Sequence, residues 1–173
     1  KVREKVDKIY DDVIIKDLME AETKLPAKYT GVDVGRATKG AAKAILGRVY
    51  MTRKDFVKAE AKLQEVTTLG YALLPNYSDL FDYTKDEHHS EYIFDIEYQD
   101  GNLGAGSGFS NKFLPKSANS AAETFYGIKG GAGEQNTPTL ALFDSFDPKD
   151  PRRDITVAKG YTDNNGVFQG FLQ

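Results

Sequence analysis

The chain has 173 residues, 40% of them hydrophobic and 28% charged, a composition typical of a globular domain with a core. Its 23 basic and 26 acidic residues give a formal charge of −3, which provides no attraction for phosphate backbones and argues against nucleic-acid binding. Without cysteine it has no disulfide, thiolate metal site or thiol nucleophile. No apolar run approaches the roughly 20 residues of a membrane span, and the first residues lack a signal-peptide core.

Hydrophobic periodicity predicts three helices before Gly70. Over residues 2–25 apolar side chains recur mostly three or four positions apart, and Pro26 is expected to end this helix. Two further helices are predicted over about residues 36–52 and 54–69, the second ended by Gly70. Because few residues join them, these two helices are expected to form an antiparallel αα-hairpin.

The predicted hairpin has the spacing of a tetratricopeptide repeat (TPR). The match consists of the Leu-Gly-x-x-Tyr element followed by a small and a large apolar residue, at Leu46, Gly47, Tyr50, Ala59 and Leu63. Gly47 is expected to let the paired helix approach closely, and Tyr50 to fill the groove beside it. Lys43 departs from the repeat, because tryptophan usually occupies that position.

After Gly70 the helical periodicity fades, and glycine, asparagine and aromatic residues become frequent. Residues 91–98 alternate with period two, which predicts a half-buried strand with Tyr92, Phe94, Ile96 and Tyr98 on one face. A short helix is predicted over residues 138–146 with Thr137 as its cap. Residues 163–166 are typical of a hairpin turn.

These elements predict a mainly α fold class: TPR-like αα-hairpins with an appended loop-rich subdomain that contains a few short β-strands. We expect residues 1–70 to form the helical scaffold and residues 71–173 to form the loop-rich, ligand-binding subdomain. Both are expected to be parts of one domain.

Longer stretches resemble the SusD/RagB family. Their order matches that of the family from about residue 1 to 161, in segments 35–42, 46–51, 55–59, 71–77, 80–81, 90–96 and 150–154. The last of these contains an Asp-Pro-Arg element. Because the chain begins without methionine, and the early and late helices of a whole member are not visible, we expect an internal piece truncated at both ends.

The resemblance implies a function as well as a fold. Members are lipid-anchored on the outer membrane of Bacteroidota, use TPR helix pairs as a scaffold, bind glycans without catalysis, and cap a SusC-like, TonB-dependent transporter. For this chain it implies surface capture of oligosaccharide or polysaccharide and delivery to such a transporter. No catalytic residue, metal or cofactor is expected, and membrane contact is expected only through a lipid anchor absent from this sequence.

The candidate sugar site lies in the loop-rich half. Sugars present CH faces that stack on aromatic rings and hydroxyl groups that need donors and acceptors, and residues 98–126 combine both kinds of partner. The predicted ligand-binding residues are five rings and three polar side chains: Tyr98, Phe109, Phe113, Phe125 and Tyr126, with Asn111, Lys112 and Asn119. The alternative for each ring is packing against the helices.

Two other functions stay open. A TPR-type protein–protein interaction module would use the helical hairpins without binding sugar. A glycoside hydrolase would need a carboxylate pair, for which Asp95 and Glu97 on one face of the predicted strand are the candidates. A solvated strand face is the ordinary interpretation of that pair.

The remaining polar clusters are interpreted as structural. Adjacent His88 and His89 are expected to be exposed loop residues. The aspartates that could gather around calcium are expected to serve turns and caps: Asp144, Asp147, Asp150, Asp154 and Asp163. Glycines 104, 106 and 108 are expected to give a binding loop its freedom rather than to hold phosphate, because no helix follows them.

Overall fold

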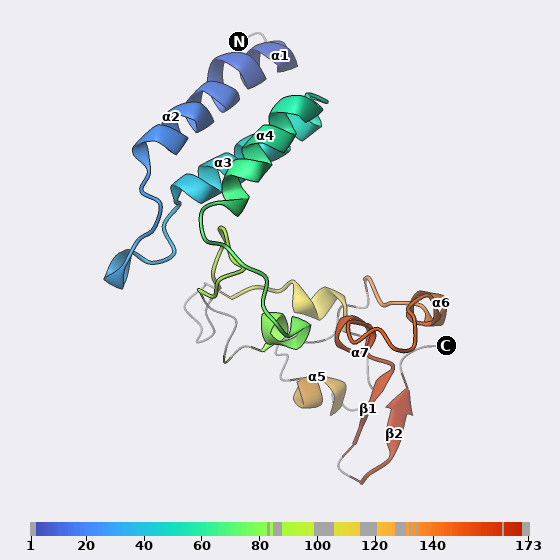
Figure 1. Ribbon diagram of the computed structural model, residues 1–173. Helices are drawn as coiled ribbons and strands as arrows, with labels where there is room; N and C mark the ends of the chain where they lie inside the picture. The colour runs from blue at the N-terminus through green and yellow to red at the C-terminus, as the bar shows by residue number, and fades with distance from the viewer. Residues whose placement is uncertain are drawn as a thin grey trace. The chain divides into compact units, whose positions relative to one another are not determined.

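A computed structural model describes residues 3–82, 84, 88–98, 106–114, 121–126, 131, 133, 135–163 and 165–170 (Figure 1). The chain groups into two compact units, Lys1–Ile96 and Glu97–Gln173, here called the helical unit and the loop unit. The mainly α fold class is confirmed. The predicted division into a scaffold of residues 1–70 and a ligand-binding part of residues 71–173 stays a prediction, and the compact units meet at Ile96 and Glu97 instead.

The first predicted helix is confirmed. It consists of α1 (Val6–Ile9), the π-helical segment η1 (Tyr10–Ile15) and α2 (Lys16–Lys24), which follow one another without a break. Leu25 leaves the helical region, with φ −75° and ψ 143°. A residue before proline is pushed toward extended backbone by the proline ring, so Pro26 ends the helix as expected.

The second helix, α3 (Lys39–Thr52), begins three residues after the predicted start. Thr38 is extended, and its Oγ1 accepts a hydrogen bond from the backbone N–H of Ala41 at 3.3 Å. A threonine at this position satisfies an N–H group that has no partner within the helix. The capping hydroxyl therefore sets the start of α3, which periodicity alone could not locate.

The third helix, α4 (Phe56–Thr67), starts in the same way. The Asp55 carboxylate accepts from the backbone N–H of Lys58 at 3.2 Å. Beyond the helix, Gly70 has a φ of +90°, a conformation that glycine adopts without steric cost. Helix α4 thus ends at Thr67, two residues before the predicted end, and Gly70 follows shortly after it. Two short 3₁₀ turns, η2 (Gly31–Asp33) and η3 (Tyr77–Phe81), complete the helical unit.

Helix α3 packs against both α2 and α4 (Figure 1). Leu46 has no exposed surface and forms a core cluster with Tyr50 and Ala59, against which Ile15 and Leu18 pack. At the other TPR position, a Cβ on residue 47 would lie 2.7 Å from Leu63 Cδ2. Gly47 thus permits the close approach of α3 and α4, and the predicted TPR-like hairpin is confirmed.

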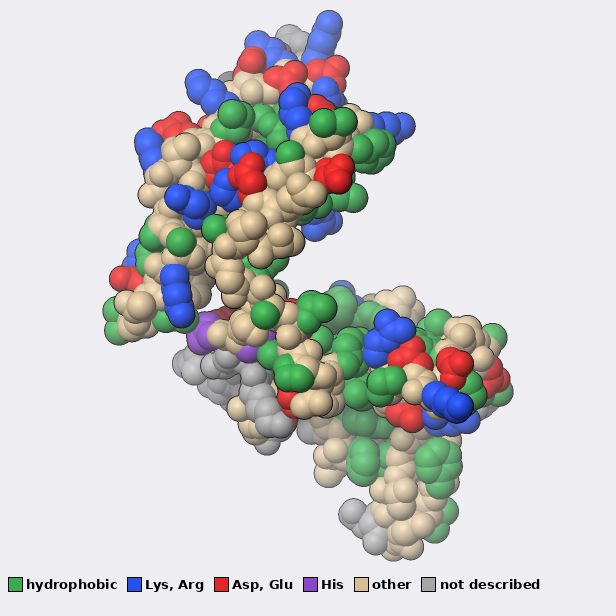
Figure 2. Space-filling view, in the orientation of Figure 1, with side chains coloured by type: hydrophobic (Ala, Val, Ile, Leu, Met, Phe, Trp, Pro, Cys, Tyr) green, Lys and Arg blue, Asp and Glu red, His purple; other side chains and the backbone are tan. Residues whose placement is uncertain are grey.

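Four charged side chains from α2, α3 and α4 meet at this packing, on a unit whose surface mixes both signs of charge (Figure 2). Lys43 is paired with Glu65 and lies 3.4 Å from Glu22, whose carboxylate also accepts from Lys62 at 2.9 Å. The side chains of Glu22 and Lys43 are only 12% and 14% exposed. Lysine therefore replaces the usual tryptophan by joining the three helices through charge.

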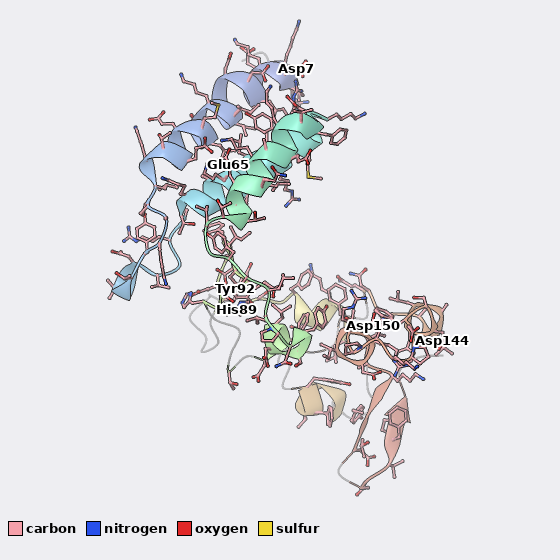
Figure 3. All side chains as sticks on the ribbon, in the orientation of Figure 1. Asp7, Glu65, His89, Tyr92, Asp144 and Asp150 are labelled. Carbon is pink, nitrogen blue, oxygen red and sulfur yellow. The ribbon has the colours of Figure 1, made fainter. Side chains whose placement is uncertain are left out.

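This network makes the stability of the helical unit depend on pH. The hydrogen bond from Lys43 holds the pKa of Glu65, seen on α4 in Figure 3, below its ordinary value of 4.5, and Lys62 contributes in the same direction. A depressed carboxyl pKa contributes stability above the unfolded value that is lost as pH falls through the folded one. We expect Glu65→Gln to reduce the loss of stability between pH 5 and pH 3, as measured by urea unfolding.

The control for this prediction is Glu60→Gln, an exposed position on the same helix. It should leave the pH dependence of the wild-type chain unchanged, because Glu60 is not one of the four side chains of the charge network. Equal pH profiles for Glu65→Gln and the wild type would contradict the role given to Glu65.

The loop unit contains short elements. They are η4 (Ser110–Lys112), α5 (Ala121–Tyr126), α6 (Leu140–Asp144), α7 (Arg153–Thr156), β1 (Gly160–Thr162) and β2 (Phe168–Gly170). The strands pair antiparallel, with Tyr161 opposite Gln169. The predicted hairpin turn is confirmed: the Asp163 carboxylate accepts from the backbone N–H groups of Asn165 and Val167, and Gly166 has a φ of +77°.

The strand predicted over residues 91–98 is wrong. These residues form a turn and irregular backbone, in which the N–H of Tyr92 donates to the carbonyl of His89 at 3.2 Å. Just before this segment, the N–H of Ala72 donates to the carbonyl of Ser90 at 3.0 Å. A strand needs a neighbouring strand along its length, and period-two alternation says nothing about whether one is available.

The helix predicted over residues 138–146 is confirmed in type but is shorter, at Leu140–Asp144. Thr139, rather than the predicted Thr137, caps it: its Oγ1 accepts from the backbone N–H of Leu142 at 3.2 Å. With Pro138 between the two threonines, both positions suit a cap by residue type, and the backbone selects the second.

Candidate functional site

All eight predicted ligand-binding residues belong to the loop unit. Seven of them lie within the described residues, and Asn119 lies outside them. Tyr98, near the start of the unit, is on irregular backbone and 61% exposed. The rings that follow form two separate groups, each held by its own local structure.

The first group is a pair of phenylalanines on either side of η4. Phe109 and Phe113 are 64% and 42% exposed, and their ring centroids lie 5.0 Å apart with an interplanar angle of 52°. The turn between them brings the rings together: the N–H of Lys112 donates to the carbonyl of Phe109 at 3.1 Å. Two apolar ring faces are thus presented side by side at a surface.

The polar residues of η4 fasten this turn to a later segment. The side-chain amide of Asn111 donates to the carbonyl of Gly131 at 2.7 Å, and the backbone carbonyl of Asn111 accepts from Gly133 N–H at the same distance. The backbone carbonyl of Lys112 accepts from the N–H groups of Gln135 and Asn136. Asn111 therefore has a structural role, while the side chain of exposed Lys112 lies next to the ring pair in sequence.

The second group lies on α5. Phe125 and Tyr126 are 56% and 36% exposed, and their rings meet edge to face with centroids 5.0 Å apart. The Tyr126 hydroxyl donates to the carbonyl of Gly160 at 2.9 Å, which ties α5 to β1, and burial raises the pKa of this phenol. The hydroxyl of Tyr126 is engaged in the fold, so Phe125 provides the more accessible ring face.

Tyr161 belongs to this second group and was missed by the sequence analysis. It is 6% exposed, and its ring centroid lies 5.5 Å from that of Phe125. A signal was available, because Gly160, Tyr161 and Thr162 precede a predicted hairpin turn and every second residue of such a strand faces the core. Tyr161 supports the exposed ring of Phe125 from beneath.

Most of the aspartates considered for calcium serve turns or ion pairs. Asp147 and Asp150 accept from the backbone N–H groups of Lys149 and Arg152, and Arg152 lowers the pKa of Asp150 to about 2. Asp154 is paired with Arg153. The residues that the structure describes contain no group of three or more potential ligands able to hold a metal ion.

The two histidines differ from each other. His88 is exposed as predicted, whereas His89 is half-buried, with its ring centroid 3.8 Å from that of Tyr92. The expectation that both are exposed loop residues is therefore wrong for His89. The sequence has no pattern that predicts a contact between two rings three positions apart in an irregular segment.

Comparison with curated proteins identifies relatives of one kind. The chain is 29% identical over 178 residues to SusD-like protein P2 of Formosa agariphila, an alignment that covers 96% of this chain and 33% of that protein. It is 28% identical over 109 residues to SusD-like protein P25 of the same organism, covering 58% of this chain and 20% of that protein. No family profile matches the chain.

Comparison with solved structures agrees. A crystal structure of a SusD-like protein from Bacteroides fragilis matches with a TM-score of 0.53 and 33% sequence identity, over 60% of this chain and 21% of that one. In both sequence and structure, the chain is similar to SusD-like proteins.

The chain spans about a third of the length of the curated relative P2 and less of P25. The family resemblance drawn from its motifs is thereby confirmed, and so is the TPR-like nature of its helical hairpin. None of the helices in its described part combines the length and apolar character that a bilayer crossing requires.

Proposed function

We propose that this SusD-like chain is part of a lipid-anchored protein of the bacterial outer surface that captures oligosaccharide or polysaccharide and delivers it to a SusC-like, TonB-dependent transporter. The similarity to SusD-like proteins supports the glycan-binding role in general. Capture without catalysis fits a site made of rings and single hydrogen-bonding groups.

The observation that carries the proposal is the exposed pair of Phe109 and Phe113. Exposing large apolar rings to water is unfavourable, and these two are 64% and 42% exposed. A closely spaced pair of exposed rings is typical of a binding surface. Sugar rings cover such a pair with their CH faces, and Lys112 adds a donor for hydroxyl groups. Tyr98 and Phe125 are further stacking residues in this proposal. Asn111 holds η4 in place and Tyr126 holds α5 in place through their hydrogen bonds to the backbone.

We expect the Phe109→Ala/Phe113→Ala double variant to bind glycan about tenfold or more weakly than the wild type, since each stacked ring contributes about 0.5–1.5 kcal/mol. Affinity electrophoresis against a panel of soluble polysaccharides first identifies a ligand of micromolar or weaker affinity, and calorimetry then gives the two Kd values. No product is expected to be released during incubation.

Phe56→Ala is the matched control, because Phe56 is a phenylalanine with the same 64% exposure on the helical unit. It should leave the Kd unchanged. A loss of equal size in the control and the double variant would show that general apolar surface, and not the ring pair, holds the glycan.

A protein-interaction module is the second candidate. Phe56 and Val57 at the start of α4 are 64% and 81% exposed, which gives the helical unit an apolar surface of its own. Blank glycan panels together with a protein that co-purifies through Phe56 would support this function instead. The hydrolase alternative loses its geometric argument, because the strand that would have placed Asp95 and Glu97 on one face does not form.

A further inference from the structure

The helical unit contains a cavity that the proposed glycan site does not use. Its volume is about 240 Å³, and three segments line it: the connector between α2 and α3, the turn after α4 around Gly70, and residues 88–95. A volume of this size has room for several water-sized groups. The cavity therefore suits a molecule with a single ring.

Aromatic rings and hydroxyls form much of its wall. Tyr29, Tyr71 and Tyr92 line it together with Phe94. The Tyr71 hydroxyl is 3.2 Å from Thr38 Oγ1, and Tyr71 packs against Gly40, where a Cβ would collide with the ring. Ring faces beside fixed hydroxyl groups suit a ligand that has both apolar CH faces and oxygen atoms.

His89 adds a donor to this wall. Its Nδ1 accepts a hydrogen bond from the backbone N–H of Glu91 at 3.1 Å, so in the neutral ring the proton is on Nε2. Nε2 is buried and has no hydrogen-bond partner among the described residues. A buried donor without an acceptor is costly, and an oxygen atom of a ligand would satisfy it. Figure 3 shows His89 and Tyr92 next to each other at this place.

The charges at the cavity favour an anion. Lys28 and Arg36 line it from the connector, and Asp95 is the one carboxylate among its lining residues. Arg36 also forms an exposed pair with Asp33 at 2.8 Å. Ammonium and guanidinium groups attract a carboxylate, and a planar carboxylate matches the guanidinium fork.

We propose that this cavity is a second ligand site, which binds one sugar-sized ring that carries a carboxylate. The carboxylate lies toward Lys28 and Arg36, the ring faces lie against the tyrosines, and a ligand oxygen accepts from Nε2 of His89 after that ring turns toward the cavity. The site belongs to a different unit from the ring pair Phe109/Phe113, so the two sites can fail separately.

Titration of the ¹⁵N-labelled chain with sodium glucuronate, followed by NMR, tests the proposal. Amide signals of residues 28–36 and 88–95 should shift. Glucose and acetate should bind at least about fivefold more weakly than glucuronate, because glucose lacks the carboxylate and acetate lacks the ring. No shift in these segments, or equal affinity for glucose, would overturn the proposal. The Phe109→Ala/Phe113→Ala variant should bind glucuronate as the wild type does.

Substitutions at Lys28 and His89 locate the contacts. Lys28→Gln should weaken glucuronate binding roughly two- to fivefold, as expected for an exposed charge, while Lys24→Gln on α2 should not. His89→Asn keeps an acceptor oxygen near the position of Nδ1 and removes the donor at Nε2, so we expect about a tenfold loss. His89→Gln, whose amide nitrogen reaches the Nε2 position, should retain more of the affinity. Unchanged binding in His89→Asn would refute the role of His89.

Discussion

Leu46→Ala is expected to lower the free energy of unfolding of the helical unit by about 2–5 kcal/mol, the range for removing a fully buried leucine. Leu46 has no exposed surface, and Tyr50, Ala59, Ile15 and Leu18 surround it from three helices. A cavity at this point weakens the contacts of α3 with both neighbours. Urea unfolding followed by circular dichroism at a helix-sensitive wavelength measures the effect.

The neighbouring residue gives the control. Ile45 is 43% exposed on the same helix, and Ile45→Ala should cost less than about 1 kcal/mol. Similar losses for the two variants would mean that the cluster around Leu46 is not the centre of the core.

Glu22→Gln is expected to lower the free energy of unfolding by about 1–3 kcal/mol, between the values for exposed and fully buried ion pairs. The substitution keeps the size of the side chain but leaves Lys43 and Lys62, which are 14% and 21% exposed, with Glu65 as their remaining carboxylate. Because Glu22 is on α2 and both lysines are on α3 and α4, the loss should appear as weaker docking of the first helix.

Glu20→Gln serves as its control, since Glu20 is on the same helix and pairs with Lys24 at an exposed position. It should change stability little. The Glu22→Leu/Lys43→Met variant should be more stable than Glu22→Gln, because removing both partners leaves Lys62 still paired with Glu65. A Glu22→Gln variant as stable as the wild type would contradict the network.

The two units are held together in different ways. In the helical unit, α2, α3 and α4 are joined by a small apolar core and by a charge network that crosses all three helices. The loop unit instead exposes its rings and fastens its turns with backbone hydrogen bonds, such as those from Gly133 and Gln135 to η4. Its ring pair can therefore be altered without affecting the core around Leu46.

The candidate site shows the limit of composition as a guide. Phe109, Phe113 and Phe125 are exposed, and their contact with sugar stays a prediction, whereas Asn111 and Tyr126 hydrogen-bond to the backbone of distant residues. An asparagine in a glycine-rich loop suits ligand binding and loop closure equally well. The hydrogen bond from Asn111 to the carbonyl of Gly131 shows that this asparagine serves loop closure.

Helices, caps and turns could be predicted from the sequence because they depend on neighbours within about four positions. The Leu46–Tyr50 motif, Gly70 and the turn before Gly166 belong to this class. Three other features could not be predicted in this way: the absence of a strand at residues 91–98, the half-buried position of His89 and the charge network of Lys43. Each depends on which distant segment lies alongside, and that is fixed by the packing of the whole unit.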